Sequence, residues 1–359
     1  MPQITIIGLG TVGSSLGLAL RRYAQAPEGK AAQFTVVGYD PDLSMQQIAQ
    51  RKDGAVDRTV GDLAAAVRDA PFVIIALPTT AMRAIFDAIA PHLPEGATVT
   101  DTAPGKRQVL RWAAELLPAG VSFVGGHPLP RKVPAPAVTS DEVTDEPPDA
   151  DLFTGAPYCI MPGATATDAA VNQVIGFAEA IGAKPFFTDP LEHDSFQAAV
   201  HDLPLVTSFA LMRVLSASPS WRDMSPLAGG AFREASRMAS VDALATREEL
   251  LANRDNVLGW IDRYQVVLSE LREMLAEAHP TERETGTARE LGAALIAARN
   301  ARTGWINPNA ALTPAEREAR DTMKGLQAGS GIMRGMFGNI LGDRLMGHRD
   351  RDGERKDRP

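Results

Sequence analysis

The sequence predicts an α/β fold, a doubly wound parallel sheet followed by an all-helical domain. Over the first 188 residues, short aliphatic runs alternate with amphipathic stretches, an order typical of parallel strands joined by right-handed helical crossovers. After Asp189 the strand-like runs stop, and long helical patterns take their place. The 359 residues, 45% of them hydrophobic, are enough for about two domains with buried cores.

Five aliphatic runs of the first half are expected to be buried strands, because they are too short for helices and are bounded by Gly, Pro or Asp. They comprise residues 4–7, 34–38, 72–77, 98–101 and 122–125. Segments between them are expected to be helices, among them residues 14–23, 44–51 and 82–92. The carboxyl ends of such strands form the edge at which open α/β sheets bind ligands.

The second half is expected to contain four helices, over residues 193–215, 230–239, 247–278 and 287–302. The third carries an apolar stripe at spacings of three, four and seven, which indicates a helix with one buried face. The stripe consists of Leu250, Leu251, Val257, Leu258, Ile261, Val266, Leu268, Leu271 and Leu275. Its partner is either the same helix in a second subunit or another part of the same chain, and the pattern leaves both open.

Charge, cysteine content and the length of apolar runs indicate which kinds of partner and which cellular compartment to expect. A formal net charge of −8 argues against nucleic acid as the main partner, because phosphate binding depends on Lys and Arg. The lone Cys159 excludes an internal disulfide, and no Cys/His spacing predicts a metal site, so a reducing compartment is expected. The longest apolar run, residues 72–77, is too short for a membrane span, and no targeting segment is recognisable. We therefore expect a cytoplasmic protein without a membrane partner.

Residues 8–13 form a glycine-rich motif, Gly-Leu-Gly-Thr-Val-Gly, between the first predicted strand and the first predicted helix. In a dinucleotide-binding turn, Gly8 permits the tight turn, Gly10 lets the backbone approach a pyrophosphate, and Gly13 allows close helix–strand packing. The helix N-terminus, with Thr11 and Val12 in its first turn, favours negative charge. The motif predicts a dinucleotide site in a Rossmann-like domain.

Asp40 follows the second predicted strand, where a carboxylate accepts hydrogen bonds from the adenosine ribose and repels a 2′-phosphate. NAD is therefore favoured over NADP as the cofactor. The spacing from Gly13 exceeds the usual figure of about 20 residues, and residues 25–33 account for the excess. The alternative role for Asp40 is a helix cap beside Pro41. The other predicted cofactor-binding residues lie at the ends of later strands: Leu77, Pro78, Thr79 and Thr102.

Further segments occur in an order that resembles the prephenate/arogenate dehydrogenase family of tyrosine biosynthesis. After the glycine motif come Ala76-Leu77-Pro78, Asp101–Lys106, Gly125-Gly126-His127-Pro128, His193-Asp194, Leu203-Pro204 and Gly229–Arg237. The resemblance extends to about residue 278. It implies an NAD-binding Rossmann domain over 1–188, a helical substrate and dimerisation domain over 189–302, and a homodimer through that helical domain. Residues 303–359 are an extension that we expect to be partly disordered.

The resemblance implies oxidative decarboxylation of a small-molecule substrate, prephenate or arogenate. A hydride passes from the hydroxyl-bearing ring carbon to the nicotinamide, and loss of carbon dioxide makes the ring aromatic. His127 suits the removal of the hydroxyl proton, because an imidazole titrates near neutral pH; its alternative is a loop histidine without a function. Arg237 is expected to bind a substrate carboxylate, with Arg233 secondary. Four residues apart, they could equally be surface arginines.

Three positions depart from the family pattern. Pro104 stands where the family has a serine that hydrogen-bonds the catalytic histidine, and Leu205 stands where it has a substrate-binding histidine. Asp202 also replaces a histidine, so His201 is a candidate substitute for substrate binding. His193 and Asp194 resemble a family pair, although a helix-cap role explains Asp194 equally well.

Three alternatives to a prephenate dehydrogenase stay open on the sequence. The first is an arogenate dehydrogenase. The second is another two-domain hydroxy-acid or imine dehydrogenase; such enzymes usually use a lysine of the helical half, and this chain has no lysine between residues 185 and 323. The third is a catalytically weakened, NAD-binding regulator, which Pro104 and Leu205 would explain.

Overall fold

The structure is a computed structural model that describes residues 1–26, 29, 33–51, 54–130, 137–139, 142–144, 147–279, 281 and 286–307. These residues fall into two compact units, 1–257 and 258–307. The predicted domain boundaries after residues 188 and 302 stay a prediction. Most of the extension predicted to be partly disordered, residues 308–359, lies outside the described part of the chain.

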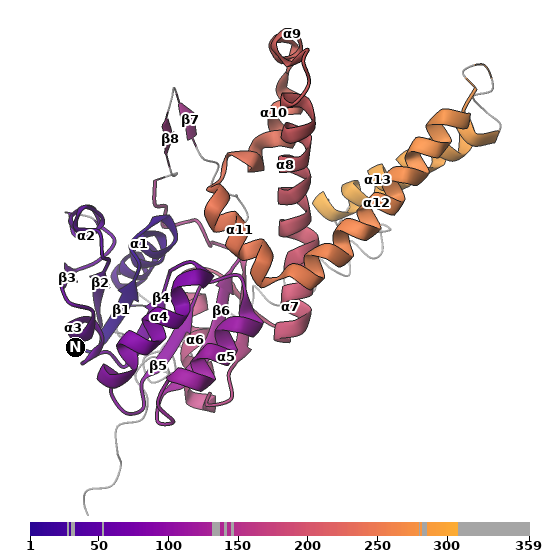
Figure 1. Cartoon of the computed structure of the whole chain (residues 1–359). Helices are drawn as coiled ribbons and strands as arrows, with labels where there is room; N and C mark the ends of the chain where they lie inside the picture. The colour runs from indigo at the N-terminus through magenta and orange to yellow at the C-terminus, as the bar shows by residue number, and fades with distance from the viewer. Residues whose placement is uncertain are drawn as a thin grey trace, which may run out of the picture. The chain divides into compact units, whose positions relative to one another are not determined.

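A mixed sheet of eight strands forms the centre of the first unit (Figure 1). Its order is β10-β9-β6-β5-β4-β1-β2-β3. The strands are β1 (Gln3–Ile7), β2 (Thr35–Tyr39), β3 (Arg58–Thr59), β4 (Phe72–Ile75), β5 (Thr98–Asp101), β6 (Ser122–Pro128), β9 (Pro157–Pro162) and β10 (Lys184–Phe187). From β3 to β6 the order is that of a dinucleotide-binding fold. The predicted fold class is confirmed.

Helices cover both faces of this sheet because its central strands are apolar on both sides. Ile6 of β1 and Phe72 of β4 pack in the core that includes α1 and α6, whereas Ile7 and Val73 pack in the core beneath α3, α4 and α5. The helices are α1 (Thr11–Gln25), α2 (Leu43–Ala49), α3 (Leu63–Val67), α4 (Thr79–Ile89), α5 (Lys106–Leu116) and α6 (Asp168–Ala180). A short separate hairpin, β7 (Ala137–Thr139) and β8 (Glu142–Thr144), lies outside the sheet.

Strand β6 is longer than predicted and continues through His127 to Pro128 instead of ending at Gly125. The physical reason is its neighbour β9, which pairs antiparallel with it and places Cys159 opposite His127. This pairing joins segments about 32 residues apart and leaves no mark in local periodicity. It makes the sheet mixed, because β10 in turn runs parallel to β9.

The helical part of the first unit starts with a continuous run, Pro190–Ser216. It consists of α7 (Pro190–Gln197), a π-helical turn η2 (Ala198–Asp202) and α8 (Leu203–Ser216). Within the described residues, this run alone is long and apolar enough to cross a membrane, judged on length and composition only; 22% of its apolar window is buried in the chain. A π-helical turn inserts an extra residue into a helix and frequently occurs at functional sites. Here it carries His201 and Asp202.

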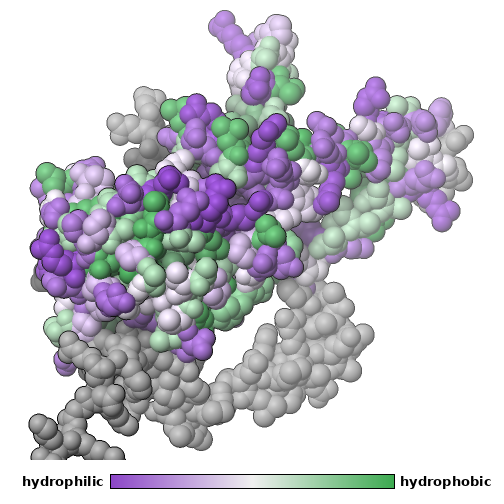
Figure 2. All heavy atoms as spheres, turned by 60° about the horizontal axis from the view of Figure 1, so that its bottom comes forward, coloured by the Kyte–Doolittle hydropathy of each residue, from purple (hydrophilic) through white to green (hydrophobic). Residues whose placement is uncertain are grey.

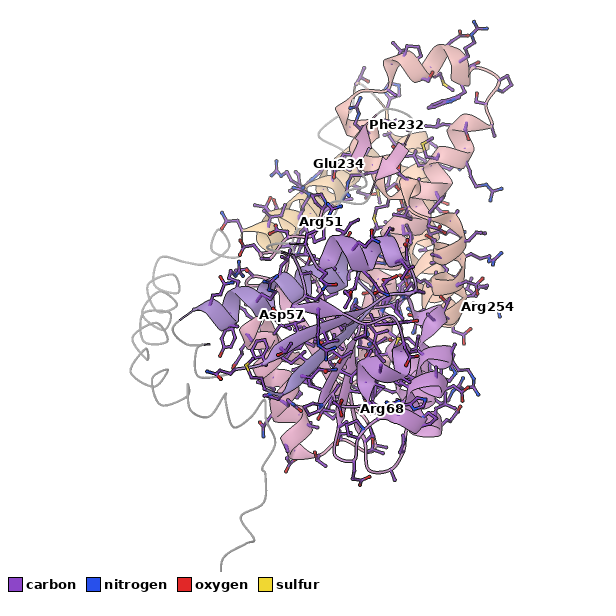
Figure 3. All side chains as sticks on the ribbon, turned by 90° about the vertical axis from the view of Figure 1, so that its left-hand side faces the viewer. Arg51, Asp57, Arg68, Phe232, Glu234 and Arg254 are labelled. Carbon is purple, nitrogen blue, oxygen red and sulfur yellow. The ribbon has the colours of Figure 1, made fainter. Side chains whose placement is uncertain are left out.

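Shorter helices follow, namely α9 (Trp221–Met224), η3 (Ser225–Leu227), α10 (Gly230–Ser236), η4 (Arg237–Ser240) and α11 (Ala243–Ala252). Figures 1 and 3 show α10, marked by Phe232 and Glu234 in Figure 3, at the end of α8 remote from the sheet. The hydroxyl of Ser208 in α8 donates a 2.7 Å hydrogen bond to the carbonyl of Ala235, which holds α10 against α8. Packing against α8 thus fixes the position of this segment.

The single helix predicted over residues 247–278 is wrong, because the structure has two helices there, α11 and α12 (Arg254–Glu277), separated at Asn253. Asn253 leaves the helical conformation with φ −113° and ψ 21°. Its side-chain amide instead donates to the carbonyl of Asp194 and to Oδ2 of Asp202. Asparagine readily makes such bonds in place of helical ones.

The second unit contains most of α12, together with α13 (Gly286–Ile306). Much of the predicted apolar stripe is exposed in the isolated chain: Leu258 is 44% exposed, Val266 58%, Leu268 54% and Leu275 64%. Figure 2 shows hydrophobic and hydrophilic side chains next to one another on the surface of this part of the chain. Among the described residues, packing within one chain buries Val257 of the stripe but leaves these four leucine and valine side chains exposed.

Candidate active site

The glycine motif forms the turn between β1 and α1, at the point where the strand order reverses between β1 and β4. Gly8 has a φ of +94°, and a Cβ on it would lie 2.4 Å from the carbonyl oxygen of Ala76. A Cβ on Gly13 would lie 1.9 Å from the carbonyl oxygen of Gly8, whereas the space beside Gly10 is open. Gly8 and Gly13 therefore have no room for a side chain, and Gly10 leaves space for a ligand, as a dinucleotide-binding turn requires.

The N-terminus of α1 suits an anion. Gly10 is its N-cap and has no side chain that could cap the helix, and the first turn, which includes Thr11 and Val12, carries no acidic residue. Peptide N–H groups and the helix dipole therefore remain directed at the open space beside Gly10. This cradle fits the diphosphate of a nucleotide.

Asp40 follows β2 directly and is 9% exposed. Its Oδ2 accepts a 2.7 Å hydrogen bond from the backbone N–H of Leu9, and its Oδ1 accepts one from Asp42. The carboxylate thus lies against the glycine turn, and each oxygen retains a lone pair for a ribose hydroxyl. The alternative role as a helix cap belongs instead to Asp42, whose side chain caps α2.

The remaining predicted cofactor residues lie at the neighbouring strand ends. Leu77 and Pro78 connect β4 to α4, and Pro78 is the N-cap of that helix. Thr79 is buried, with its hydroxyl 3.4 Å from the N–H of Gly105, and Thr102 donates its backbone N–H to Ile75. All four therefore border the carboxyl edge of β4 and β5, while their contacts with a cofactor stay a prediction.

His127 lies in β6 and is 8% exposed. Its Nδ1 lies 2.9 Å from Nε2 of His193 in α7, and the two rings meet edge to face with centroids 5.1 Å apart. Nδ1 of His193 lies 3.1 Å from Oδ1 of Asp194. Three side chains, from a strand and a helix 66 residues later, therefore form one buried hydrogen-bonded chain.

Asp194 is held by the N-terminus of α5. Its Oδ1 accepts a hydrogen bond of 2.9 Å from the backbone N–H of Lys106, and its Oδ2 accepts one of 3.0 Å from Arg107. The cap of its own helix α7 is a different residue, Asp189. The helix-cap role considered for Asp194 is therefore correct, but the helix that it caps is α5 and not its own α7. Its carboxylate lies where the helix dipole stabilises an anion.

Burial of His127 lowers its pKa well below the ordinary 6.5, and the nearby His193, Lys106 and His201 lower it further. The imidazole is therefore neutral at pH 7. A neutral histidine at the carboxyl edge of the sheet can accept a proton from a bound hydroxyl group. The structure thus brings the predicted base together with a partner that sequence reasoning left without a role.

A second cluster adjoins the first at η2. Nδ1 of His201 lies 3.0 Å from Oδ1 of Asp202, and this hydrogen bond raises the pKa of His201. Asp202 is 4% exposed. Burial raises the pKa of the nearby Glu249 on α11. A small cavity between these elements is lined by Thr79, Pro104, Gly105, Gln108, Asp194, Gln197, Asp202, Glu249, Ala252 and Asn253.

Arg233 lies on α10, and Arg237 is the first residue of η4. Arg233 is exposed. Arg237 keeps 30% of its side chain exposed, with Nε 3.7 Å from Oε1 of Glu234. Among the described contacts, none joins either arginine to His127 or to the cavity beside Pro104. Their substrate-binding role stays a prediction.

Sequence reasoning missed Asn253 and did not settle the role of His193. Asn253 connects Asp194 to Asp202 across the site, and the only sequence signal was a poor helix former inside a predicted helix. Metal binding has no support among the described residues, where no three His, Cys, Asp or Glu side chains cluster suitably.

Comparison with known proteins agrees with this geometry in both halves of the chain. Residues 17–186 match the nucleotide-binding domain of prephenate dehydrogenase, and residues 189–285 match the prephenate dehydrogenase dimerization domain. Prephenate dehydrogenase of Bacillus subtilis is 27% identical over 274 residues, which are 75% of this chain and 69% of the relative. Cyclohexadienyl dehydrogenase of Zymomonas mobilis is 28% identical over 76% of this chain and 88% of the relative.

Solved structures show the same fold. The crystal structure of A. aeolicus prephenate dehydrogenase in complex with hydroxyphenyl propionate and NAD+ covers 84% of this chain and 98% of its own, with a TM-score of 0.70 and 25% identity. Synechocystis arogenate dehydrogenase superposes with a TM-score of 0.65 at 22% identity, over 84% of this chain and 99% of its own. With both domains matched in order and the nucleotide cradle in place, the chain belongs to the prephenate dehydrogenase family.

Proposed function

We propose that this chain is an NAD-dependent prephenate dehydrogenase. It converts prephenate and NAD+ into 4-hydroxyphenylpyruvate, carbon dioxide and NADH, a step of tyrosine biosynthesis. Family membership and the relatives named prephenate dehydrogenase support the activity. The single observation that carries it is the buried, neutral His127, hydrogen-bonded to His193 at the carboxyl edge of the nucleotide-binding sheet.

The reaction requires a base for the ring hydroxyl, and His127 is assigned that part. As the hydroxyl proton moves to the imidazole, the hydroxyl-bearing ring carbon loses its hydride and becomes a carbonyl carbon. The ring carboxylate leaves as carbon dioxide, the electron pair of the broken bond passes through the ring to the carbonyl oxygen, and that oxygen takes a proton back to form the phenol of the product. Gain of aromaticity drives the decarboxylation. General-base catalysis by a positioned histidine contributes about 10²–10⁴ in rate.

NAD+ supplies the hydride acceptor when it is bound. The residues present fit it: the open space beside Gly10 and the uncapped N-terminus of α1 suit its diphosphate, and Asp40 offers a carboxylate where the adenosine ribose would lie. A negative charge at Asp40 repels the extra phosphate of NADP. Leu77, Pro78, Thr79 and Thr102 would border the nicotinamide half.

Arg237, with Arg233 as a secondary contact, is proposed to bind a substrate carboxylate. In the isolated chain both are partly or fully exposed, and a second subunit packed on the helical half would change their surroundings. His201 is proposed as a further substrate contact, because the Asp202 hydrogen bond raises its pKa and so favours the cationic form. The match to a dimerization domain supports a homodimer through the helical half.

Arogenate is a second candidate substrate, on one specific observation. The cavity beside Pro104 is lined by three acidic side chains, Asp194, Asp202 and Glu249. Carboxylates attract an ammonium group and repel a carboxylate, and arogenate carries an ammonium where prephenate carries a ketone. Comparing kcat/KM for the two substrates in wild type and Asp202→Asn decides this: a role for the acids predicts that the variant loses more activity on arogenate.

The direct test is NADH formation by the purified protein with prephenate, with arogenate, and with a panel of hydroxy acids. Turnover of prephenate supports the proposal. Turnover only of a simple hydroxy acid or of an imine would identify a different two-domain dehydrogenase, and NAD binding without any turnover would identify a regulator. The cytoplasmic location and the absence of nucleic-acid or membrane partners stay predictions from composition.

A further inference from the structure

We propose that His193 is a positioning residue that, held by Asp194, fixes His127 in the tautomer whose Nε2 carries no proton. This inference rests on the proposed function, since it explains how the base is kept ready. Pro104, in the loop after β5, has no side-chain group that could hydrogen-bond the imidazole. Among the described contacts, the side-chain hydrogen bond to His127 comes from His193.

The direction of each hydrogen bond follows from Asp194. Its two oxygens face the backbone N–H groups of Lys106 and Arg107, which can only donate. Oδ1 therefore acts as an acceptor, and Nδ1 of His193, 3.1 Å away, donates to it. A neutral imidazole carries one N–H, so Nε2 of His193 is left as an acceptor.

The acceptor on His193 in turn determines where the ring of His127 carries its proton. Nε2 of His193 lies 2.9 Å from Nδ1 of His127, and an acceptor on one side requires a proton on the other. His127 therefore carries its proton on Nδ1. Its Nε2 has a free lone pair, which is the form that can accept the proton of a substrate hydroxyl. The fixed carboxylate of Asp194, linked to His127 through His193, thus determines which nitrogen of His127 is the base.

The partners are rigid enough to hold this arrangement. His127 lies in a strand paired on the β9 side, and its exposed fraction is 8%; His193 and Asp194 are 4% and 6% exposed. Asn253 donates to the backbone carbonyl of Asp194 at 2.8 Å, which restrains the end of the chain. Orientation of a catalytic histidine by a buried acceptor on its second nitrogen is a known way to fix the tautomer.

Other charged and titratable groups surround the pair. Lys106 on α5 is bonded to Asp101 of β5, Cys159 lies opposite His127 on β9, and His201 approaches from η2. Two of these neighbours, Lys106 and His201, favour a neutral His127. If Nε2 of His193 carried a proton, it would donate to Nδ1 of His127, and the proton of His127 would lie on Nε2. The proposal is therefore tested by observing which nitrogen of His127 is protonated.

The first measurement is ¹⁵N NMR of the full-length protein, labelled at histidine and with NAD+ bound. The protein has six histidines. The His127 signals are assigned by comparison with His127→Asn. The proposal predicts a protonated Nδ1 and an unprotonated Nε2 near pH 7.5. A proton on Nε2 of His127 overturns it. This result does not depend on turnover of any substrate, so it stays informative even if prephenate is not the substrate.

The second measurement compares His193→Phe with His193→Gln. Phenylalanine keeps a ring but removes the acceptor, and we expect kcat to fall roughly 10–100-fold while KM for prephenate and the Kd of NAD+ change less than about threefold. The amide oxygen of glutamine can reach the place of Nε2 and accept from His127, so His193→Gln should retain most of the kcat. The exposed His92 provides the matched control, His92→Phe.

Equal loss in both variants overturns the acceptor role, and so does an unchanged kcat in His193→Phe. Circular dichroism and NAD+ binding identify a variant that fails to fold. For such a variant the NMR measurement on wild type still decides the question.

Discussion

Nζ of Lys106 lies 2.6 Å from Oδ2 of Asp101, and both side chains are completely buried. Nζ also donates to the carbonyl of Gly126, the residue before His127. The pair therefore connects the end of β5, the start of α5 and the strand that carries the base. Burial lowers the pKa of Lys106, and the attraction of Asp101 opposes that shift.

We expect Lys106→Met to lower the free energy of unfolding by about 3–5 kcal/mol, because it leaves the carboxylate of Asp101 buried without its countercharge. Adding Asp101→Asn should recover part of the loss, since the amide removes the unpaired charge. Urea unfolding of the wild type, Lys106→Met and the double variant checks this. A loss under about 1 kcal/mol in Lys106→Met, with the flanking structure intact, is incompatible with this account.

The pH profile should report the depressed pKa of His127. A base works in its unprotonated form, so kcat/KM falls at acidic pH as the free enzyme takes up a proton. Because burial, His193 and Lys106 lower the pKa of His127 well below 6.5, the acid limb should have its midpoint below pH 6.5. An acid limb with a midpoint at or above pH 7 would contradict a buried neutral base.

Cofactor choice should depend on the charge of Asp40. Asp40→Asn keeps the size of the side chain but removes the negative charge that repels a 2′-phosphate, so the ratio of kcat/KM for NADP+ to that for NAD+ should rise about tenfold or more. The matched control is Asp42→Asn, two residues along, where the exposed side chain caps α2. An unchanged ratio in Asp40→Asn would show that the carboxylate of Asp40 does not select between NAD+ and NADP+.

The exposed apolar face of α12 should form a subunit interface. Leu268, 54% exposed in the single chain, would be buried by a second copy, and Leu268→Glu would place a charge in that contact. Light scattering after size-exclusion chromatography should show a dimer for wild type and a monomer for the variant. Glu273→Gln, on the same helix, serves as a control; a dimer in Leu268→Glu would place the interface elsewhere.

Local patterns predicted the parts of the molecule that depend on local geometry. The glycine turn at residues 8–13 and the placement of Asp40 at a strand end follow from a few adjacent residues. The parts that were missed depend on contacts between distant segments. The antiparallel partner β9 and the break at Asn253 exist because of neighbours far along the chain.

The hydrogen-bonded chain behind His127 shows the same limit. His127 was chosen from its position, yet nothing in its flanking residues indicates His193, 66 positions later. The two meet because α5 and α7 pack together, with Asp194 on the N–H groups of Lys106 and Arg107. Asp194 was assigned two equal alternatives because a sequence shows which residues can cap a helix, but not which helix they cap.

The most direct test measures NADH and carbon dioxide formation from prephenate by the wild type and by His127→Asn, with the Kd of NAD+ determined for both by calorimetry. We expect equimolar NADH and carbon dioxide from the wild type. The variant should bind NAD+ equally well and turn over about 10³-fold more slowly. Full activity in His127→Asn, or no NADH from the wild type with either prephenate or arogenate while NAD+ binds, would contradict the account.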